Sequence, residues 1–285
     1  MKIFEISNYL NEQLLLDIKA ENNQEYVDEF HITESNSTYR YNKKEFNLKV
    51  NFNHIFYHRL DGVKLFYKPF PKLKKKFPFL DFTKYSWLNE KIQRDFLIES
   101  LKYKLNDDDI IIVSDIDEII DFNFFLEIKD LVKKKEIITL KFYQTFYYFN
   151  LFEFNNNSGP KDWSYRTFIM TGKYFKQIKS IEKLRIMGAS NQLINKIYCP
   201  EKIMGFHHTW LLSNDLDYKL SNYSHTIKEH KMLKNYKKNI DNKILLNIVK
   251  LKKNVIEGND LTENSQIKLL DSIENKRKKL KHLFV

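Results

Sequence analysis

The chain has 285 residues, of which 42% are hydrophobic and 15% aromatic, so it can bury a large core and is not a disordered protein. Its one cysteine, Cys199, excludes an intrachain disulfide and a cysteine-based zinc site, and it fits a reducing compartment. The net charge of +11 points to an acidic partner, while the lack of a signal-like start and of any run of about 18 apolar residues predicts a cytoplasmic protein without a membrane span.

The first hundred residues predict alternating helices and strands. Residues 10–20 have helical spacing, residues 26–34 alternate as a strand, and residues 35–38 form a polar loop. Further strand is expected within 54–67, and a proline- and lysine-rich irregular loop follows it. Residues 86–105 repeat apolar side chains at four-residue spacing and predict a helix.

The next segment, an isoleucine-rich run followed by Asp115 and Asp117, carries most of the functional information. The run predicts a buried strand, and successive side chains on a strand point to opposite faces. Both carboxylates are therefore expected on one face at the carboxyl end of the strand, where α/β folds place ligands. Such a pair repels and is costly to desolvate without a cation, so it predicts a Mg²⁺ or Mn²⁺ site shared with a diphosphate. Glu118 then faces the other way, either supporting this site or making a salt bridge or helix cap.

The remainder predicts a helix at 122–134, strands at 137–150 and 163–171, and helix from about residue 212 to the end with a break at Gly258-Asn259-Asp260. Strands that alternate with helices predict an α/β core. The sequence has no GxGxxG and no Walker A motif, so phosphate binding must come from a metal and from side chains.

The basic charge is concentrated in the carboxyl-terminal segment. Residues 226–285 hold 15 Lys and Arg against 7 Asp and Glu, a net charge of +8. This segment predicts an acidic partner such as nucleic acid, anionic lipid or a phosphorylated glycan, or else a solvated lysine-rich helical face. We expect a core domain at 1–225 and a basic helical extension at 226–285.

Five blocks stand in order between about residues 10 and 230. They are Asn11-Glu12 with Leu15-Leu16-Asp17-Ile18-Lys19, Val27-Asp28-Glu29-Phe30 with Glu34, Ser35 and Thr38, Gln93-Arg94, Asp109 to Ile119, and Gly205-Phe206-His207 with Lys219, Leu220 and His225. Together these blocks resemble glycosyltransferase family 17, the family of the bisecting β-1,4-N-acetylglucosaminyltransferases. The departures from the family pattern are Leu14 for an acidic residue, Lys19 for Arg, Ile120 for Pro and Phe206 for Trp; none removes the two carboxylates.

The resemblance implies a GT-A fold, a Rossmann-like and mostly parallel sheet flanked by helices. It implies inverting sugar transfer from a UDP-sugar, with UDP-N-acetylglucosamine as the first candidate, through an Asp-x-Asp motif and Mn²⁺ or Mg²⁺. The acceptor would be a glycan or glycolipid, with no nucleic acid bound, and residues 226–285 could contact an anionic membrane peripherally.

Metal and donor ligands can be assigned within this resemblance. Asp117 is expected as a direct metal ligand, and Asp115 as a ligand or as a contact to ribose or metal-bound water. Of His207, His208 and His225, the resemblance favours His225 for the metal or diphosphate, and His207 for the wall of the pocket or the acceptor.

Donor-site candidates also follow the first core strand. Glu34, Asn36 and Thr38 lie where GT-A folds hold the nucleotide base, and the alternative for each is ordinary turn hydrogen bonding. Arg94 is a candidate for the diphosphate or for a buried salt bridge.

The acceptor hydroxyl needs a general base, and Asp162 is our choice, with Glu118 as a supporting acidic group. Trp163 could stack on a sugar or belong to the core, and Tyr147 or Tyr148 could lie near the acceptor.

Two other functions fit the same features. Paired acids also hold metals in nucleases, and a basic aromatic chain suits nucleic acid, so a metal-dependent nuclease or other nucleic-acid-binding enzyme is one alternative. A non-catalytic basic module that binds membrane or nucleic acid through residues 226–285 is the other, although it leaves Asp115 and Asp117 without a role.

Overall fold

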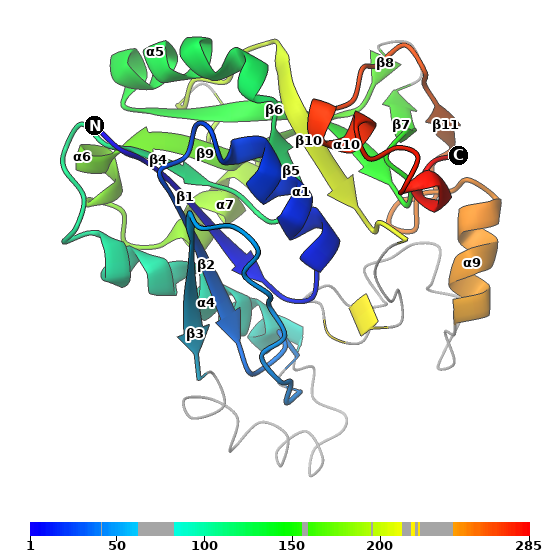
Figure 1. Cartoon of the computed structure of the whole chain (residues 1–285), viewed down its shortest axis with the longest axis horizontal. Coiled ribbons are helices and arrows are strands. Elements are labelled where there is room, and N and C mark those ends of the chain that lie inside the picture. Colours follow the sequence, from blue (N-terminus) through cyan, green and yellow to red (C-terminus); the bar gives the residue numbers. More distant parts are fainter. Residues whose placement is uncertain are drawn as a thin grey trace.

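Figure 1 shows the fold as a computed structural model, which describes residues 1–40, 42–61, 83–155, 159–194, 196–212, 218–219, 222 and 242–285. Across these residues eleven strands join in one sheet, whose main path is β11-β7-β6-β9-β4-β1-β2-β3. The strands are β1 Ile3–Tyr9, β2 Glu29–Ser35, β3 Ile55–Leu60, β4 Ile110–Val113, β5 Glu118–Ile120, β6 Ile137–Phe146, β7 Leu151–Asn155, β8 Gly159–Pro160, β9 Asp162–Thr171, β10 Ile203–Thr209 and β11 Leu261–Glu263.

Helices flank this sheet on both faces, which confirms the predicted α/β class (Figure 1). Helices α4 and α7 pack against each other, α4 against β1 and β2, and α7 against β9. Helix α1 packs against α10. The helices are α1 Gln13–Asn23, α4 Thr83–Leu101, α5 Phe125–Lys135, α6 Gly172–Phe175, α7 Ile181–Ala189, α9 Asn242–Lys250 and α10 Asp271–Glu274, with short 3-10 turns at Phe122–Phe124 and Lys281–Leu283.

Strand β4 is apolar throughout because both of its faces are covered. Ile110 and Ile112 belong to the core that includes α1 and α5, whereas Ile111 and Val113 belong to the core that includes α4, α6 and α7. The alternation that defines a strand therefore divides one isoleucine-rich run between two hydrophobic layers.

Strand directions bring the functional segments to one edge of the sheet. Strands β4, β1, β2 and β3 are parallel to one another. Strand β9 is antiparallel to both β4 and β6, so β6 runs in the same direction as β4, and β10 is parallel to β6. The carboxyl ends of β1, β4, β6 and β10 therefore share the edge where α/β sheets place their ligands.

The carboxyl-terminal segment differs from the predicted helical extension. Strand β11 pairs antiparallel with β7, and Leu270, Ile273 and Leu283 lie in the same core as α1. Helix is therefore the wrong prediction for residues 261–263, and residues 242–285 contribute to the main sheet and core. The lysines at 278, 279 and 281 are exposed. No helix in the described ranges is long and apolar enough to cross a membrane.

Candidate active site

The two carboxylates of the Asp-x-Asp motif lie in a turn and not on a strand. Strand β4 ends at Val113, and the backbone N–H of Glu118 donates to the carbonyl of Asp115 at 3.1 Å, which closes the turn before β5. Strand alternation stops where β4 stops, so the predicted common face is wrong. Asp115 and Asp117 instead contact different side chains: Asp115 contacts two arginines, and Asp117 contacts a histidine and a lysine.

Lys19 of α1 stabilises this turn by hydrogen bonds to its backbone and to Ser114. Its Nζ atom donates to Ser114 Oγ at 2.7 Å, to the Asp115 carbonyl at 2.7 Å and to the Glu118 carbonyl at 2.8 Å. It also forms an ion pair with Glu5 at 3.0 Å, and both side chains are almost fully buried. A buried ammonium is tolerated when it is paired and hydrogen-bonded in this way, so Lys19 fixes the shape of the turn.

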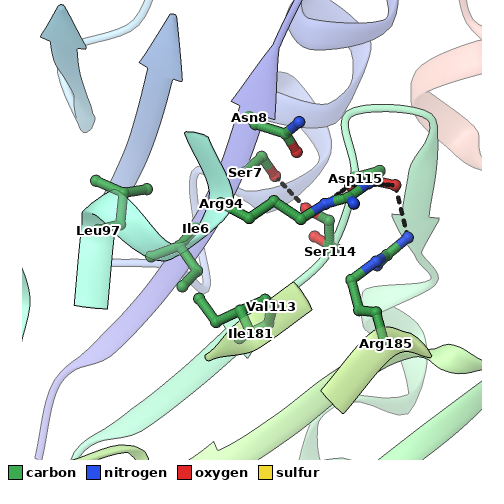
Figure 2. A pocket seen from close by; sticks show the side chains of 10 residues that line it. All are labelled: Ile6, Ser7, Asn8, Arg94, Leu97, Val113, Ser114, Asp115, Ile181 and Arg185. Atoms are coloured by element: carbon green, nitrogen blue, oxygen red, sulfur yellow. Dashed lines mark hydrogen bonds and ion pairs between the residues drawn. The ribbon is translucent and has the colours of Figure 1, made fainter. Parts of the chain in front are cut away.

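Asp115 is bound by two arginines that come from different helices, as Figure 2 shows. Arg94 of α4 donates to its two oxygens at 3.0 and 2.9 Å, and Arg185 of α7 donates to Oδ2 at 2.6 Å. Arg94 also pairs with Glu90 at 2.6 Å and with Glu182. Burial disfavours the charge of Arg94, but the three carboxylates raise its pKa well above the ordinary value. Of the two roles expected for Arg94, diphosphate binding or a buried salt bridge, the geometry supports the buried salt bridge.

Glu118 is fully buried and accepts five hydrogen bonds. The donors are the backbone N–H of Asp115, the Trp163 indole, the Thr167 hydroxyl and two nitrogens of Arg185. Burial opposes ionisation of Glu118, but Arg185 lowers its pKa well below the ordinary value. Glu118 therefore positions Trp163 and Arg185 and has no oxygen left for proton transfer.

Asp117 faces a histidine and a lysine. Its Oδ2 lies 3.5 Å from Nε2 of His207 and 3.9 Å from Nζ of Lys219. Burial raises the pKa of Asp117, but His207 and Lys219 outweigh it and lower the pKa below the ordinary value. His207 stacks on Trp163 with ring centroids 4.3 Å apart, and its buried Nδ1 has no hydrogen-bond partner among the described residues.

A cavity of about 560 Å³ opens beside Asp115, a volume in the range of small-molecule sites. A small hollow formed by Asn8, Glu12, Tyr39 and Asp117 shares Arg94 and Asp115 with it. The side chains that line the larger cavity are Glu90, Arg94, Asp115, Gln144, Trp163, Arg166, Glu182, Arg185, Ile186, Ala189, His207, Thr209, Trp210 and Ile256.

The donor-site candidates after β2 are engaged elsewhere. Glu34 is fully buried, pairs with Lys44 and Tyr57, and accepts the backbone N–H of Asn47 at 2.9 Å. Thr38 accepts from the backbone of residue 42, and Asn36 donates to the Asp61 carboxylate. Asn36 and Thr38 thus make turn hydrogen bonds, which was the alternative to nucleotide binding. Glu34 is wrong as a nucleotide contact because protein donors already occupy its oxygens.

Asp162 is wrong as the general base because it faces away from the cavity. In the pairing of β9 with β6, Asp162 is opposite Tyr143, and Trp163 is opposite Phe142. Adjacent side chains point to opposite faces, and Trp163 lines the cavity, so Asp162 points to the other face of the sheet. The three carboxylates in the cavity lining, at positions 90, 115 and 182, all pair with Arg94.

The other aromatic and histidine candidates make structural contacts or lie outside the described residues. His208 is buried in the core with its Nδ1 2.8 Å from Thr145, and burial lowers its pKa to about 3. The Tyr147 hydroxyl bonds the backbone of Lys253 and Val255, which ties it to the carboxyl-terminal segment. Tyr148 packs in the core cluster beside it. His225 lies outside the described residues.

Sequence reasoning did not single out Arg166, Arg185, Gln144 or Trp210. Arg185 follows Glu182 by three residues on α7. Glu182 pairs with Arg94, and Arg185 pairs with Asp115. That spacing is common on surface helices, so it carried no signal for a buried network.

A divalent cation fits Asp117 and His207 better than Asp115. The Asp117 carboxylate and the His207 imidazole, with Oδ2 and Nε2 3.5 Å apart, form an oxygen and nitrogen donor pair of the kind that transition metals accept. The Asp115 oxygens are already bound by arginines. Within the described ranges, no three His, Cys, Asp or Glu side chains converge, so the remaining ligands would come from elsewhere.

Comparison with known proteins gives one family match. The model of glycosyltransferase family 17 matches residues 1–263. The curated proteins give no match. Mannose-6-phosphate isomerase from Helicobacter pylori is similar at 12% identity, covering 80% of this chain and 92% of its own, with a TM-score of 0.32. S. aureus TarS 1–349 is similar at 10% identity, covering 73% and 60%, also with a TM-score of 0.32. Scores this low support no inference about this chain.

Proposed function

Because the chain belongs to glycosyltransferase family 17 and is a glycosyltransferase, we propose that it moves a sugar from a UDP-sugar to a hydroxyl of a glycan or glycolipid. UDP-N-acetylglucosamine is the first candidate donor. The proposal includes dependence on Mn²⁺ or Mg²⁺ and inversion at the anomeric carbon. Family membership favours sugar transfer over the nuclease and over the non-catalytic basic module.

One observation supports the metal dependence most strongly: Oδ2 of Asp117 lies 3.5 Å from Nε2 of His207, with Asp117 in the small hollow and His207 in the large cavity beside Asp115. These two side chains would hold the cation. When bound, a divalent cation neutralises the negative charge that develops on a leaving diphosphate.

The cavity of about 560 Å³ has room for a nucleotide-sugar, whereas the hollow of Asn8, Glu12 and Tyr39, at about 20 Å³, has room only for a water or an ion. The donor would therefore lie in the larger cavity beside Asp115, with the acceptor toward Trp210 and Ile256. Arg94 and Arg185 hold Asp115 rigid in the wall of this cavity, so the donor meets a preorganised surface.

Peripheral membrane contact belongs to the same proposal. The exposed lysines at 278, 279 and 281 would attract anionic lipid, which would bring the enzyme to a glycolipid acceptor. Co-sedimentation with anionic but not neutral vesicles would support this contact. A cytoplasmic location stays a prediction.

The test is a donor screen that measures UDP release from UDP-sugars by the full chain, with and without Mn²⁺. Hydrolysis requires no knowledge of the acceptor. We expect Mn²⁺-dependent release from UDP-N-acetylglucosamine and its loss in Asp117→Asn. The matched control, Asp130→Asn on the exposed side of α5, should keep wild-type activity. Full activity in Asp117→Asn would refute the metal assignment, and no release from any UDP-sugar would refute the donor class.

A further inference from the structure

The three arginines that line the large cavity differ in their partners. Arg94 pairs with three carboxylates, and Arg185 pairs with Asp115 and Glu118. Arg166 forms no ion pair or side-chain hydrogen bond with any of the residues that the structure describes. Its guanidinium lies 4.9 Å from the ring of Trp163. Of the three arginines in the cavity wall, Arg166 is therefore the one that no described carboxylate pairs with, so its guanidinium can bind an anionic ligand.

The backbone around Arg166 is shaped to present this side chain. The pairing of β9 with β6 shifts register between Thr139 and Lys141, opposite the stretch that contains Tyr165. Tyr165 has a positive φ of 57°, which is uncommon for a bulky residue. The Arg166 carbonyl accepts a hydrogen bond from Arg185 Nη1 at 2.7 Å. Bulges of this kind redirect side chains and are frequent beside active sites.

Leaving Arg166 in this position is unfavourable in the free protein. Burial and the neighbouring Arg185 lower the pKa of Arg166 and outweigh the opposing effect of Glu118 and Asp115, so its surroundings disfavour the charged form. A cation that is partly removed from water, and that lies near a second cation, gains most from an anionic ligand. Trp163 meanwhile holds it in place, because its indole is fixed by Glu118 at 2.9 Å.

We propose that Arg166, held on Trp163, is the anion-binding residue of the cavity and pairs with phosphoryl or carboxylate oxygens of a substrate. Its guanidinium fork suits two oxygens of one phosphate. The anion comes either from the diphosphate of the donor or from an acidic group on the acceptor. This inference rests on the proposed function for the identity of the anion, but not for the presence of the anion site.

The test measures binding by calorimetry to wild type, Arg166→Gln and Arg166→Lys, with UDP, uridine and inorganic pyrophosphate as the probes. We expect Arg166→Gln to weaken pyrophosphate binding by about tenfold or more, and Arg166→Lys to recover part of it. The control, Arg277→Gln, removes an exposed arginine that pairs with Glu274 and should bind all probes as wild type does.

The pattern across probes identifies the source of the anion. If UDP weakens together with pyrophosphate while uridine is unchanged, the donor diphosphate binds Arg166. If UDP is unchanged and pyrophosphate still binds the UDP-saturated wild type through Arg166, the anion belongs to the acceptor. If wild type binds pyrophosphate through Arg166 but binds no UDP, the anion site stands and the proposed donor fails.

A structural role for Arg166 would give a different result. Because it has no described carboxylate partner, Arg166→Gln should melt at or above the wild-type temperature without ligand. A lower melting temperature together with unchanged pyrophosphate binding would overturn the proposal. Wild-type binding of pyrophosphate and UDP by Arg166→Gln, or no binding of pyrophosphate by wild type, would overturn it as well.

Discussion

The Nζ atom of Lys19 lies 2.7 Å from the carbonyl oxygen of Asp115, although the two residues are 96 positions apart in the sequence. The same ammonium binds the Glu118 carbonyl and the carboxylate of Glu5. A side chain of α1 thus satisfies the backbone of the acidic turn from inside the protein. The position of the Asp-x-Asp carboxylates depends on this buried cation as much as on strand β4.

Replacing Lys19 with Met should therefore destabilise the fold strongly. The change leaves Glu5 as an uncompensated buried charge and removes one donor from each of the Asp115 and Glu118 carbonyls, which typically costs about 3–5 kcal/mol. Urea unfolding would measure the loss. Lys2→Met is the matched control, because Lys2 also pairs with a glutamate but is exposed, and it should leave the unfolding midpoint close to wild type. Equal stability of Lys19→Met and wild type would contradict this role.

Glu118→Gln should weaken the hydrogen bonds that fix Trp163 and Arg185 in the cavity wall, without a change in side-chain size. The amide keeps some hydrogen bonds but loses its charge opposite Arg185, and hydrogen bonds to charged groups contribute about 1.5–3 kcal/mol each. We expect that loss in urea unfolding, with reduced UDP release because Trp163 and Arg185 lose their fixed partner. Glu127→Gln, on an exposed pair with Lys202, is the control and should change neither quantity. Unchanged activity in Glu118→Gln would argue against a positioning role.

Local pattern was enough to predict part of the site. The apolar run of β4 predicted a buried strand, which the structure covers on both faces, and the acids after it predicted a ligand edge. These two signals lie within a few residues of each other, so no knowledge of distant pairing was needed. His207 was singled out only through the family resemblance, which favoured it for the pocket wall or the acceptor and favoured His225 for the metal.

The partners of those residues could not be predicted because they come from far along the chain. Arg185 meets Asp115 across 70 residues, and its helix carries no distinguishing spacing. The misassigned Asp162 shows a second limit. Which residues of β9 face the cavity depends on pairing with β6, and that pairing contains a register shift. Likewise β11 has three residues and forms only by pairing with β7, so its own sequence did not predict it.

Gly205→Ala should disrupt the contact between β10 and β5. A Cβ atom at this position would lie 2.4 Å from the carbonyl oxygen of Ile119 and 2.8 Å from the Phe142 ring. Overpacking of this kind typically costs about 1–3 kcal/mol, and thermal unfolding would measure it. Adding Phe142→Leu should not restore stability, because the nearest atom belongs to the backbone. Full recovery in the double variant would show that the ring alone sets the constraint.

Stability should fall as the pH falls below neutrality, through His31. This residue is 1% exposed, its Nδ1 lies 2.8 Å from His58, and its Nε2 lies 3.0 Å from Glu29. Burial lowers the pKa of His31 from 6.5 to about 4, despite the opposing effect of Glu29 and with smaller contributions from His58 and Lys104. Between these two values the unfolded chain binds a proton that the folded chain does not.

The unfolding free energy should therefore be highest above pH 6.5, the unfolded value, and should decrease toward the folded value near pH 4. The slope due to this residue is at most about 1.4 kcal/mol per pH unit. Urea unfolding at about pH 7.5 and about pH 5 would measure the decrease. His31→Gln should reduce the decrease, whereas His282→Gln, at an exposed position, should leave it as in wild type. The same decrease in His31→Gln and wild type would show that acid sensitivity arises elsewhere, since the substitution removes the only titration that this argument uses.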